Sequence, residues 1–188
     1  MTKVQTALDN WFVNHLSTLK TILRVSFGIV WMIDGALKFQ PGFSLLSNIQ
    51  SAASGAPAWL APWFNFWINM TNVNPTFLTY SIGAIELALA LGLILGFLRK
   101  IVYIVGFLYS LVVWSVPEGF GGPYGPGSTD IGTGIIYAFV FALLMIVNAG
   151  FGPSKLSLDY LIEKKLPSWR RLAEIHSPRA KKLSSNDN

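Results

Sequence analysis

Ionisable residues lie inside or beside long apolar runs of this chain, where charged groups are rare. Five of them are Arg24, Asp34, Lys38, Glu86 and Asp130. A charge placed in lipid costs at least about 2.5 kcal/mol, so such residues normally face a protein interior, a partner charge or a substrate path. Carboxylates and a lysine that share a lipid-shielded site can bind a polar ligand group and move protons. The search for function therefore starts at these positions.

The apolar runs that carry these residues are about the length needed to cross a membrane. They cover residues 19–37, 77–98, 101–116 and 131–149. A helix rises roughly 1.5 Å per residue and a hydrocarbon core is about 30 Å thick. The composition agrees, because 12% of the residues are charged against about 25% in an average protein. The sequence predicts an all-α fold, an integral membrane four-helix bundle.

One membrane domain with an extension at each end accounts for the whole length. We predict an amphipathic N-terminal segment at 1–18, a four-span membrane domain at 19–151 and a basic tail at 152–188. The connection at 39–76 has no Asp, Glu, Lys or Arg and is rich in Trp and Phe, which favour the headgroup layer. Prolines interrupt it, so we expect an aromatic-rich interfacial segment with one or two short helices between the first two spans.

Basic residues are distributed unevenly along the chain. They precede the first run, form the Arg99-Lys100 connection between the second and third, and follow the fourth. Because basic loops stay in the cytoplasm, we expect a multi-pass protein of a prokaryotic plasma membrane with both termini cytoplasmic. The net charge of +5 predicts contact between the tail and the lipid bilayer rather than nucleic acid.

Several cofactors are disfavoured by what the chain lacks. It has no cysteine, and its two histidines, His15 and His176, lie outside the apolar runs. Cysteine-ligated iron–sulfur clusters and thiolate metal sites are therefore excluded, and a haem between the spans has no ligands. We predict no haem, no iron–sulfur cluster and no metal.

One face of the first run combines charge with an aromatic ring. Arg24, Trp31 and Lys38 share it at helical spacing. Asp34 lies one turn before Lys38, a favourable spacing for an ion pair. By depth, the Arg24 side chain can reach Glu86 in the second run. Such a buried pair either holds the helices in register or belongs to a site.

A second group of polar residues is expected at the outer end of the bundle, below the aromatic segment. Asp34, Lys38, Glu118 and Asp130 meet there in the predicted topology. They form either helix caps and a surface ion pair, or a small polar chamber in which acids relay protons to a quinone head group. The residues that can stack on or bind such a ring are Arg24, Trp31, Glu86, Trp114, Tyr124 and Tyr137. The aromatic residues also suit simple interfacial anchoring.

Two stretches of the chain resemble a known family. Residues 24–38, with Arg-x-x-x-Gly followed by Gly-x-x-Lys, together with Glu86 and the glycines after it, resemble the DoxX-like family of four-helix membrane proteins. The stretch 118–137, with Glu-Gly-Phe-Gly-Gly-Pro-Tyr and Thr-Asp-Ile-Gly-Thr-Gly-Ile-Ile-Tyr, resembles the DoxD branch. DoxD is the larger subunit of thiosulfate:quinone oxidoreductase, which couples two thiosulfates into tetrathionate and passes electrons to quinone.

The resemblance, which covers about residues 20–151, implies a specific function. The chain would be the membrane subunit of that oxidoreductase, with membrane quinone as electron acceptor. Its partner would be a small DoxA-like subunit, and a homo-oligomer is compatible with this assignment. Asp34, Lys38, Glu118 and Asp130 would be its catalytic residues. The alternative is a non-catalytic DoxX-type subunit that organises a respiratory or redox complex. A transporter is a third hypothesis, but the spans show no inverted repeat or broken helix.

Overall fold

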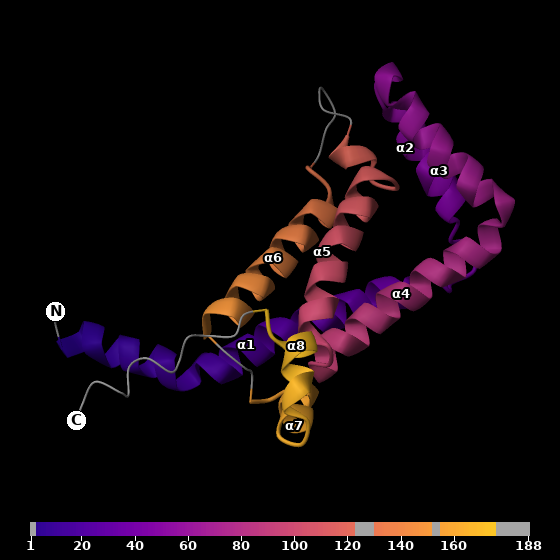
Figure 1. Ribbon diagram of the computed structural model, residues 1–188. Helices are drawn as coiled ribbons and strands as arrows, with labels where there is room; N and C mark the ends of the chain where they lie inside the picture. Colours follow the sequence, from indigo (N-terminus) through magenta and orange to yellow (C-terminus); the bar gives the residue numbers. More distant parts are fainter. Residues whose placement is uncertain (1–2, 123–129, 152–154, 176–188) are drawn as a thin grey trace.

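Two pairs of long helices form the body of the protein. The computed structural model describes residues 3–122, 130–151 and 155–175, and no strand occurs in these ranges. α1 (Lys3–Leu37) lies along α4 (Pro75–Leu95), and α5 (Arg99–Ser115) lies along α6 (Thr133–Phe151) (Figure 1). All four helices contribute to one hydrophobic core, which contains Phe27, Trp31, Leu89, Ala90, Leu93, Tyr103, Phe141 and Leu144.

Glycines allow the paired helices to approach each other closely. A Cβ atom on Gly28 of α1 would lie 2.8 Å from the Ile94 side chain of α4. A Cβ atom on Gly106 of α5 would lie 2.1 Å from the Phe141 ring of α6. Both distances are shorter than ordinary packing contacts between carbon atoms. The small-residue pattern therefore sets the spacing within each pair, as in other membrane helices.

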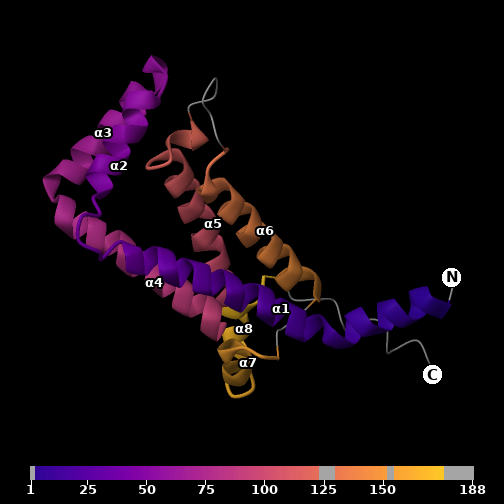
Figure 2. The same ribbon diagram turned by 180° about the vertical axis from the view of Figure 1, so that it is seen from behind.

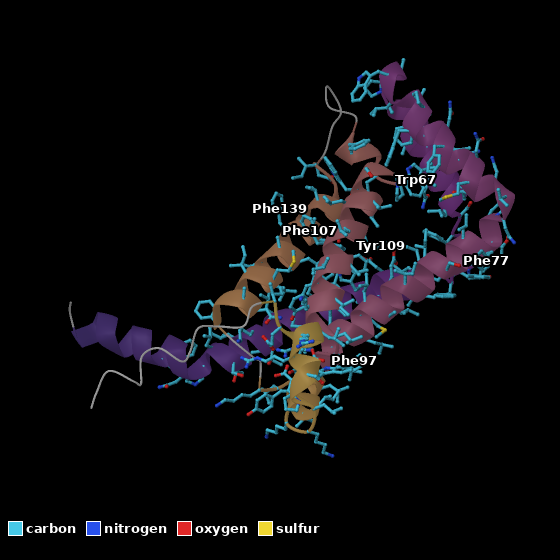
Figure 3. All side chains as sticks on the ribbon, viewed as in Figure 1. Trp67, Phe77, Phe97, Phe107, Tyr109 and Phe139 are labelled. Atoms are coloured by element: carbon cyan, nitrogen blue, oxygen red, sulfur yellow. The ribbon has the colours of Figure 1, made fainter. Side chains whose placement is uncertain are left out.

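Three of the described helices are long and apolar enough to cross a membrane. These are Asn14–Leu37 within α1, Pro75–Leu95 and Thr133–Phe151. α5 has 17 residues and is about 25 Å long at roughly 1.5 Å per residue, so it falls short of the other three. The three long apolar helices thus support a helical membrane protein, and a fourth span formed by α5 stays a prediction. Figure 3 shows large apolar side chains on the outside of the helices, among them Phe77 and Phe139, which are 64% and 67% exposed.

The aromatic connection between α1 and α4 contains short helices, as expected, and these form a helical hairpin. α2 (Leu45–Gly55) begins after Ser44, whose side chain accepts the N–H of Ser47. The short η1 (Ala58–Leu60) then leads into α3 (Ala61–Val73), which has a proline in its first turn. A proline is tolerated at that position because the first N–H groups of a helix lack intrahelical partners. The α2–α3 hairpin stands beside the α5–α6 pair and leaves an opening between them (Figure 2).

A second small helical unit lies at the opposite end of the α4–α5 pair. It comprises α7 (Leu158–Glu163), η3 (Pro167–Trp169) and α8 (Arg170–Ala173) (Figure 1). We call residues 155–175 the cap. The cap falls within the segment predicted as a basic tail, and it is folded against the chain reversal between α4 and α5. Asp159 at its centre accepts the backbone N–H groups of Leu98 and Arg99 at 2.8 and 2.9 Å.

Candidate ligand site

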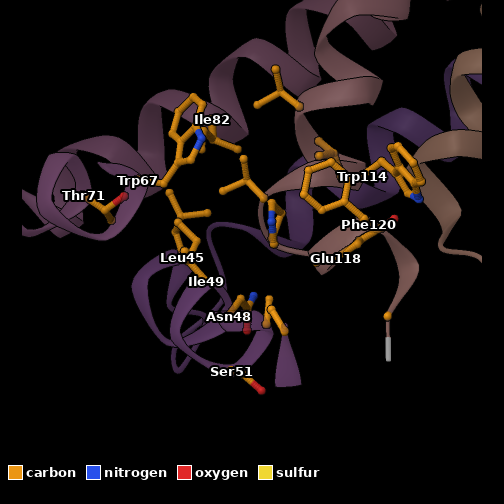
Figure 4. Close-up of a pocket in the computed structure, with 18 of the residues that line it drawn as sticks. Leu45, Asn48, Ile49, Ser51, Trp67, Thr71, Ile82, Trp114, Glu118 and Phe120 are labelled. Atoms are coloured by element: carbon orange, nitrogen blue, oxygen red, sulfur yellow. The ribbon is translucent and has the colours of Figure 1, made fainter. Parts of the chain in front are cut away.

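A large cavity opens between the α2–α3 hairpin and α4, α5 and η2 (Gly119–Gly121) (Figure 4). Its volume is about 1240 Å³, above the range of roughly 300–1,000 Å³ that is usual for small-molecule sites. Its lining is mainly apolar and aromatic, and includes Leu45, Ile49, Trp67, Ile82, Trp114 and Phe120. The cavity therefore has the size and surface to hold a lipid-soluble ligand.

A polar cluster of three side chains lies on the inner wall of the cavity. The Lys38 ammonium is 3.6 Å from Oε2 of Glu86, and the Tyr109 hydroxyl donates to Oε1 of Glu86 at 3.0 Å. The residue Glu86 is 3% exposed. Its Oε2 has an ion-pair partner but accepts no hydrogen bond. The wall thus presents a buried carboxylate with an unused acceptor, next to a lysine.

Two further polar groups line the same cavity from α3. Nε1 of Trp67 and Oγ1 of Thr71 are buried and have no hydrogen-bond partner, and Thr71 is 1% exposed. Both residues are visible on one side of the cavity in Figure 4. Buried polar atoms are nearly always hydrogen-bonded, so each exception requires an explanation. A ligand with acceptor atoms would satisfy these two donors.

At the rim of the cavity, Glu118 holds the start of α6. Its carboxylate accepts the N–H of Gly134 at 2.8 and 3.1 Å, which satisfies a free donor at a helix N-terminus. Burial raises the pKa of Glu118, the Gly134 bond partly offsets this, and the acids Asp130 and Asp34 raise it further. Glu118 therefore lines the cavity, but its main hydrogen bonds serve the backbone.

Asp130 precedes α6, which begins at Thr133, and its Oδ1 accepts the N–H of Gly132 at 2.7 Å. Nearby, Nε1 of Trp114 donates to the Ile131 carbonyl at 2.8 Å. Trp114 also lines the cavity. Asp130 thus shapes the turn before α6, close to Glu118.

The predicted pairing of Arg24 with Glu86 was wrong. Arg24 donates to the carbonyls of Leu93 and Ile94 at the end of α4, and to that of Leu156 in the cap at 2.8 Å. The last carbonyls of a helix lack intrahelical partners and attract a cation. Lys38, rather than Arg24, makes the ion pair with Glu86, because it enters from the opposite end of α1. Arg24 consequently belongs to the cap end of the protein.

Three other predicted site residues lie outside the cavity lining that the structure describes. Trp31 is 2% exposed in the core and packs against the rings of Tyr109, Tyr137 and Phe141. Tyr137 approaches Asp34, and Asp34 lies near both Glu86 and Glu118. These residues therefore lie next to the polar cluster of Lys38, Glu86 and Tyr109, but outside the cavity lining that the structure describes. Tyr124 falls outside the described residues.

Three cavity residues were not anticipated from the sequence. Tyr109 is a tyrosine in an apolar run three residues after Gly106, and this position could have marked it as an inward-facing residue. Trp67 and Thr71 are four residues apart and therefore share a helix face. Among the described residues, no three His, Cys, Asp or Glu side chains lie close enough together to bind a metal ion.

The fold defines a helical membrane protein, and its cavity is lined by apolar side chains and a few polar groups. The family profile named DoxX matches residues 19–117, which is more than half of the 188 residues, and the chain belongs to the DoxX family. The matched range contains Lys38, Glu86 and Tyr109, and it ends before the 118–137 stretch that resembles DoxD. Neither a search of curated proteins nor a search of solved structures found a match.

Proposed function

We propose that this DoxX-family protein is the quinone-binding membrane subunit of an oxidoreductase, and that the quinone occupies the cavity beside the α2–α3 hairpin. One observation carries the proposal. A mainly apolar cavity of about 1240 Å³ has a lysine–carboxylate–tyrosine cluster with a buried carboxylate on one wall and two unpartnered donors on α3. An apolar pocket with a few convergent polar groups is the expected form of a small-molecule site.

The chemistry of a quinone fits these residues. Its head group is a planar ring with two carbonyl acceptors at opposite ends, and it accepts two electrons and two protons. Lys38 is the donor for one carbonyl, and Trp67 with Thr71 supplies donors for the other. Aromatic side chains such as Trp114 and Phe120 give the ring flat surfaces to stack on. The apolar remainder of the cavity suits an isoprenoid tail.

Glu86 is the group placed to handle a proton at the cavity wall. Its Oε1 is held by the Tyr109 hydroxyl, while Oε2 faces Lys38 without a hydrogen bond. A general acid or base must lie within hydrogen-bond reach of the atom it serves, and Oε2 is the free oxygen. Asp34, which lies near Glu86, is the next carboxylate along a route toward Glu118 at the rim.

The electron donor that we propose is thiosulfate, in line with the DoxD-like stretch of the sequence. Thiosulfate is a dianion, and four of the described acids lie at the same end as Lys38: Asp34, Glu86, Glu118 and Asp130. Their charge opposes anion binding. We therefore assign the sulfur chemistry, oxidation of thiosulfate to tetrathionate, to a surface shared with a small DoxA-like subunit. In this arrangement the cavity faces the outer side of a prokaryotic plasma membrane and the cap faces the cytoplasm.

The first test is direct quinone binding to the purified full chain. A soluble ubiquinone or menaquinone analogue is titrated in detergent, and quenching of tryptophan fluorescence is recorded. Lys38→Met should raise the Kd about 10- to 100-fold, since a hydrogen bond to a charged group contributes about 1.5–3 kcal/mol. Lys155→Met, at an exposed position in the cap, is the matched control and should bind as the wild type does. Absence of saturable binding, or equal affinity in both variants, would refute the proposal.

The second test concerns the reaction. The chain is reconstituted with a DoxA-like subunit, and quinone reduction is followed after addition of thiosulfate. Thiosulfate-dependent reduction that is lost in Lys38→Met supports the enzyme. Quinone binding without turnover in an intact complex would instead favour the non-catalytic subunit that organises a redox complex.

A further inference from the structure

We infer that the outer surface of the cap is a binding site for anionic phospholipid headgroups. The site consists of exposed basic residues carried by the cap elements and the segment before them. They are Lys155, Lys164, Lys165, Arg170 and Arg171. This surface lies at the opposite end of the bundle from the quinone cavity (Figure 1), so the inference does not depend on the proposed redox function.

The cap separates its charges by sign. Its three acids, Asp159, Glu163 and Glu174, all turn inward to the guanidinium of Arg99, at 3.0, 3.4 and 2.6 Å. Their side chains are 0%, 13% and 3% exposed. The outward charges of residues 155–175 are therefore almost entirely positive. A cluster of this kind beside a membrane attracts anionic lipid by about 1 kcal/mol per basic residue.

Leucines lie among these basic residues and are also exposed. Leu161 and Leu166 are 57% and 56% exposed, and Leu172 is 39% exposed. Short helical elements that expose both basic and apolar side chains lie in the interface of a bilayer. A soluble anion would account for the basic residues but not for the leucines. An anionic phospholipid accounts for both, through its headgroup and its acyl chains.

The cap is held firmly at the end of the membrane helices, and this places the surface at headgroup level. The Leu156 carbonyl accepts from Arg24, the Asp159 N–H donates to the Gly96 carbonyl at 3.1 Å, and Asn148 donates to the Ala173 carbonyl at 3.1 Å. These bonds connect the cap to α1, α4 and α6. The basic residues thus form a fixed site, unlike a flexible polybasic tail.

The experiment measures lipid preference of the full chain by native mass spectrometry. The protein in neutral detergent is offered equal amounts of phosphatidylglycerol and phosphatidylcholine, and the ratio of bound lipids is read. The wild type should prefer phosphatidylglycerol. The variant Lys164→Gln/Lys165→Gln/Arg170→Gln/Arg171→Gln should lose that preference by about tenfold or more. Added salt should weaken the wild-type preference, because exposed charges are screened.

A control variant and a replacement variant complete the experiment. Arg179→Gln/Lys181→Gln/Lys182→Gln neutralises the basic residues after position 175 and should retain most of the preference. Lys165→Gln/Arg171→Gln, at two exposed positions, replaces the fourfold variant if that one does not fold, and should lose about half of the preference on a logarithmic scale. A preference that survives in the cap variants, or that the tail variant abolishes, would overturn the inference. Detection of bound inorganic phosphate in place of bound phospholipid would overturn the inference as well.

Discussion

The two ends of this protein both bury ionisable side chains, yet they differ in how completely those groups are paired. At the cap end, Arg99 is 2% exposed and contacts three carboxylates, and Asp159 also accepts from Trp169 and from two backbone N–H groups. At the cavity end, Glu86 has a loose ion pair and one hydrogen bond, and two donors on α3 have none.

This difference separates a structural network from the proposed ligand site. A buried polar network whose members are satisfied specifies one arrangement of the chain, whereas an unsatisfied one is costly. The cavity end retains its unpaired groups next to an open volume, where a ligand can complete them. The lining of this cavity, as far as the structure describes it, contains no residue of the cap. We expect substitutions at the cap to change stability and substitutions at the cavity to change binding.

The largest effect is expected on breaking the cap network with Arg99→Met. This change leaves three inward-facing carboxylates without their cation, and removal of one partner of a buried ion pair costs about 3–5 kcal/mol. SDS titration should show the loss in free energy of unfolding, and protease should cleave within residues 155–175. Arg171→Met, at an exposed position, is the control, with a change within about 0.5 kcal/mol. Equal stability of the two variants would contradict the network.

A smaller loss of stability is expected for Arg24→Met. The carbonyls of Leu93, Ile94 and Leu156 lose a charged donor, which costs about 1.5–3 kcal/mol. Quinone affinity should stay at the wild-type value because Arg24 lies outside the cavity lining that the structure describes. SDS titration and fluorescence quenching measure the two quantities on the same sample. A fall in quinone affinity together with the fall in stability would contradict this prediction and indicate that Arg24 belongs to the quinone site.

Thr71→Val should give effects of opposite sign on stability and binding. The substitution removes a buried hydroxyl that has no partner, so the ligand-free protein should be as stable as the wild type or about 1 kcal/mol more stable. Quinone should bind about fivefold more weakly, which corresponds to about 1 kcal/mol for one lost hydrogen bond. Thr21→Val is the control, since Thr21 donates to the Ser17 carbonyl at 2.9 Å away from the cavity. Unchanged quinone affinity in Thr71→Val would remove this hydroxyl from the site.

The smallest effect is a pH dependence that comes from Glu118. Burial raises the pKa of its carboxyl in the folded state, so folding favours the protonated form. That contribution is complete below the unfolded value of about 4.3 and is lost as the pH rises through the folded pKa. The wild type should therefore lose stability relative to Glu118→Gln as the pH rises from the unfolded pKa through the higher folded pKa. Parallel stability curves, measured by SDS titration at each pH, would refute this.

The main helices were predicted closely because each depends on local sequence. The run at 77–98 became Pro75–Leu95, and the run at 101–116 became Arg99–Ser115. Short helices at 39–76 were expected as well, since prolines interrupt this aromatic-rich segment. Hydropathy and helix breakers act over one or two turns, so no information about distant contacts was needed.

The partners of the buried charges were not predicted, because they depend on contacts between distant parts of the chain. Depth alone allowed Arg24 to meet Glu86, but a depth estimate does not say which side chain reaches the carboxylate first. Arg99 was interpreted as a positive-inside residue of a short connection, while its partner Asp159 lies 60 residues later in what was predicted to be a tail. A pairing over that distance leaves no periodic signal in a single sequence.

The sequence by itself determined that this is a helical membrane protein, that an aromatic-rich segment with short helices follows its first span, and that a few ionisable groups must be shielded from lipid. Those properties follow from hydropathy, helix propensity and the cost of burying charge, which act on short segments. Only the tertiary structure decided that Lys38 pairs with Glu86, that Arg24 and Arg99 hold the cap, and that Trp67 and Thr71 face a cavity without partners. These arrangements depend on how helices distant in the chain are placed against each other, because side-chain pairing is a property of packing.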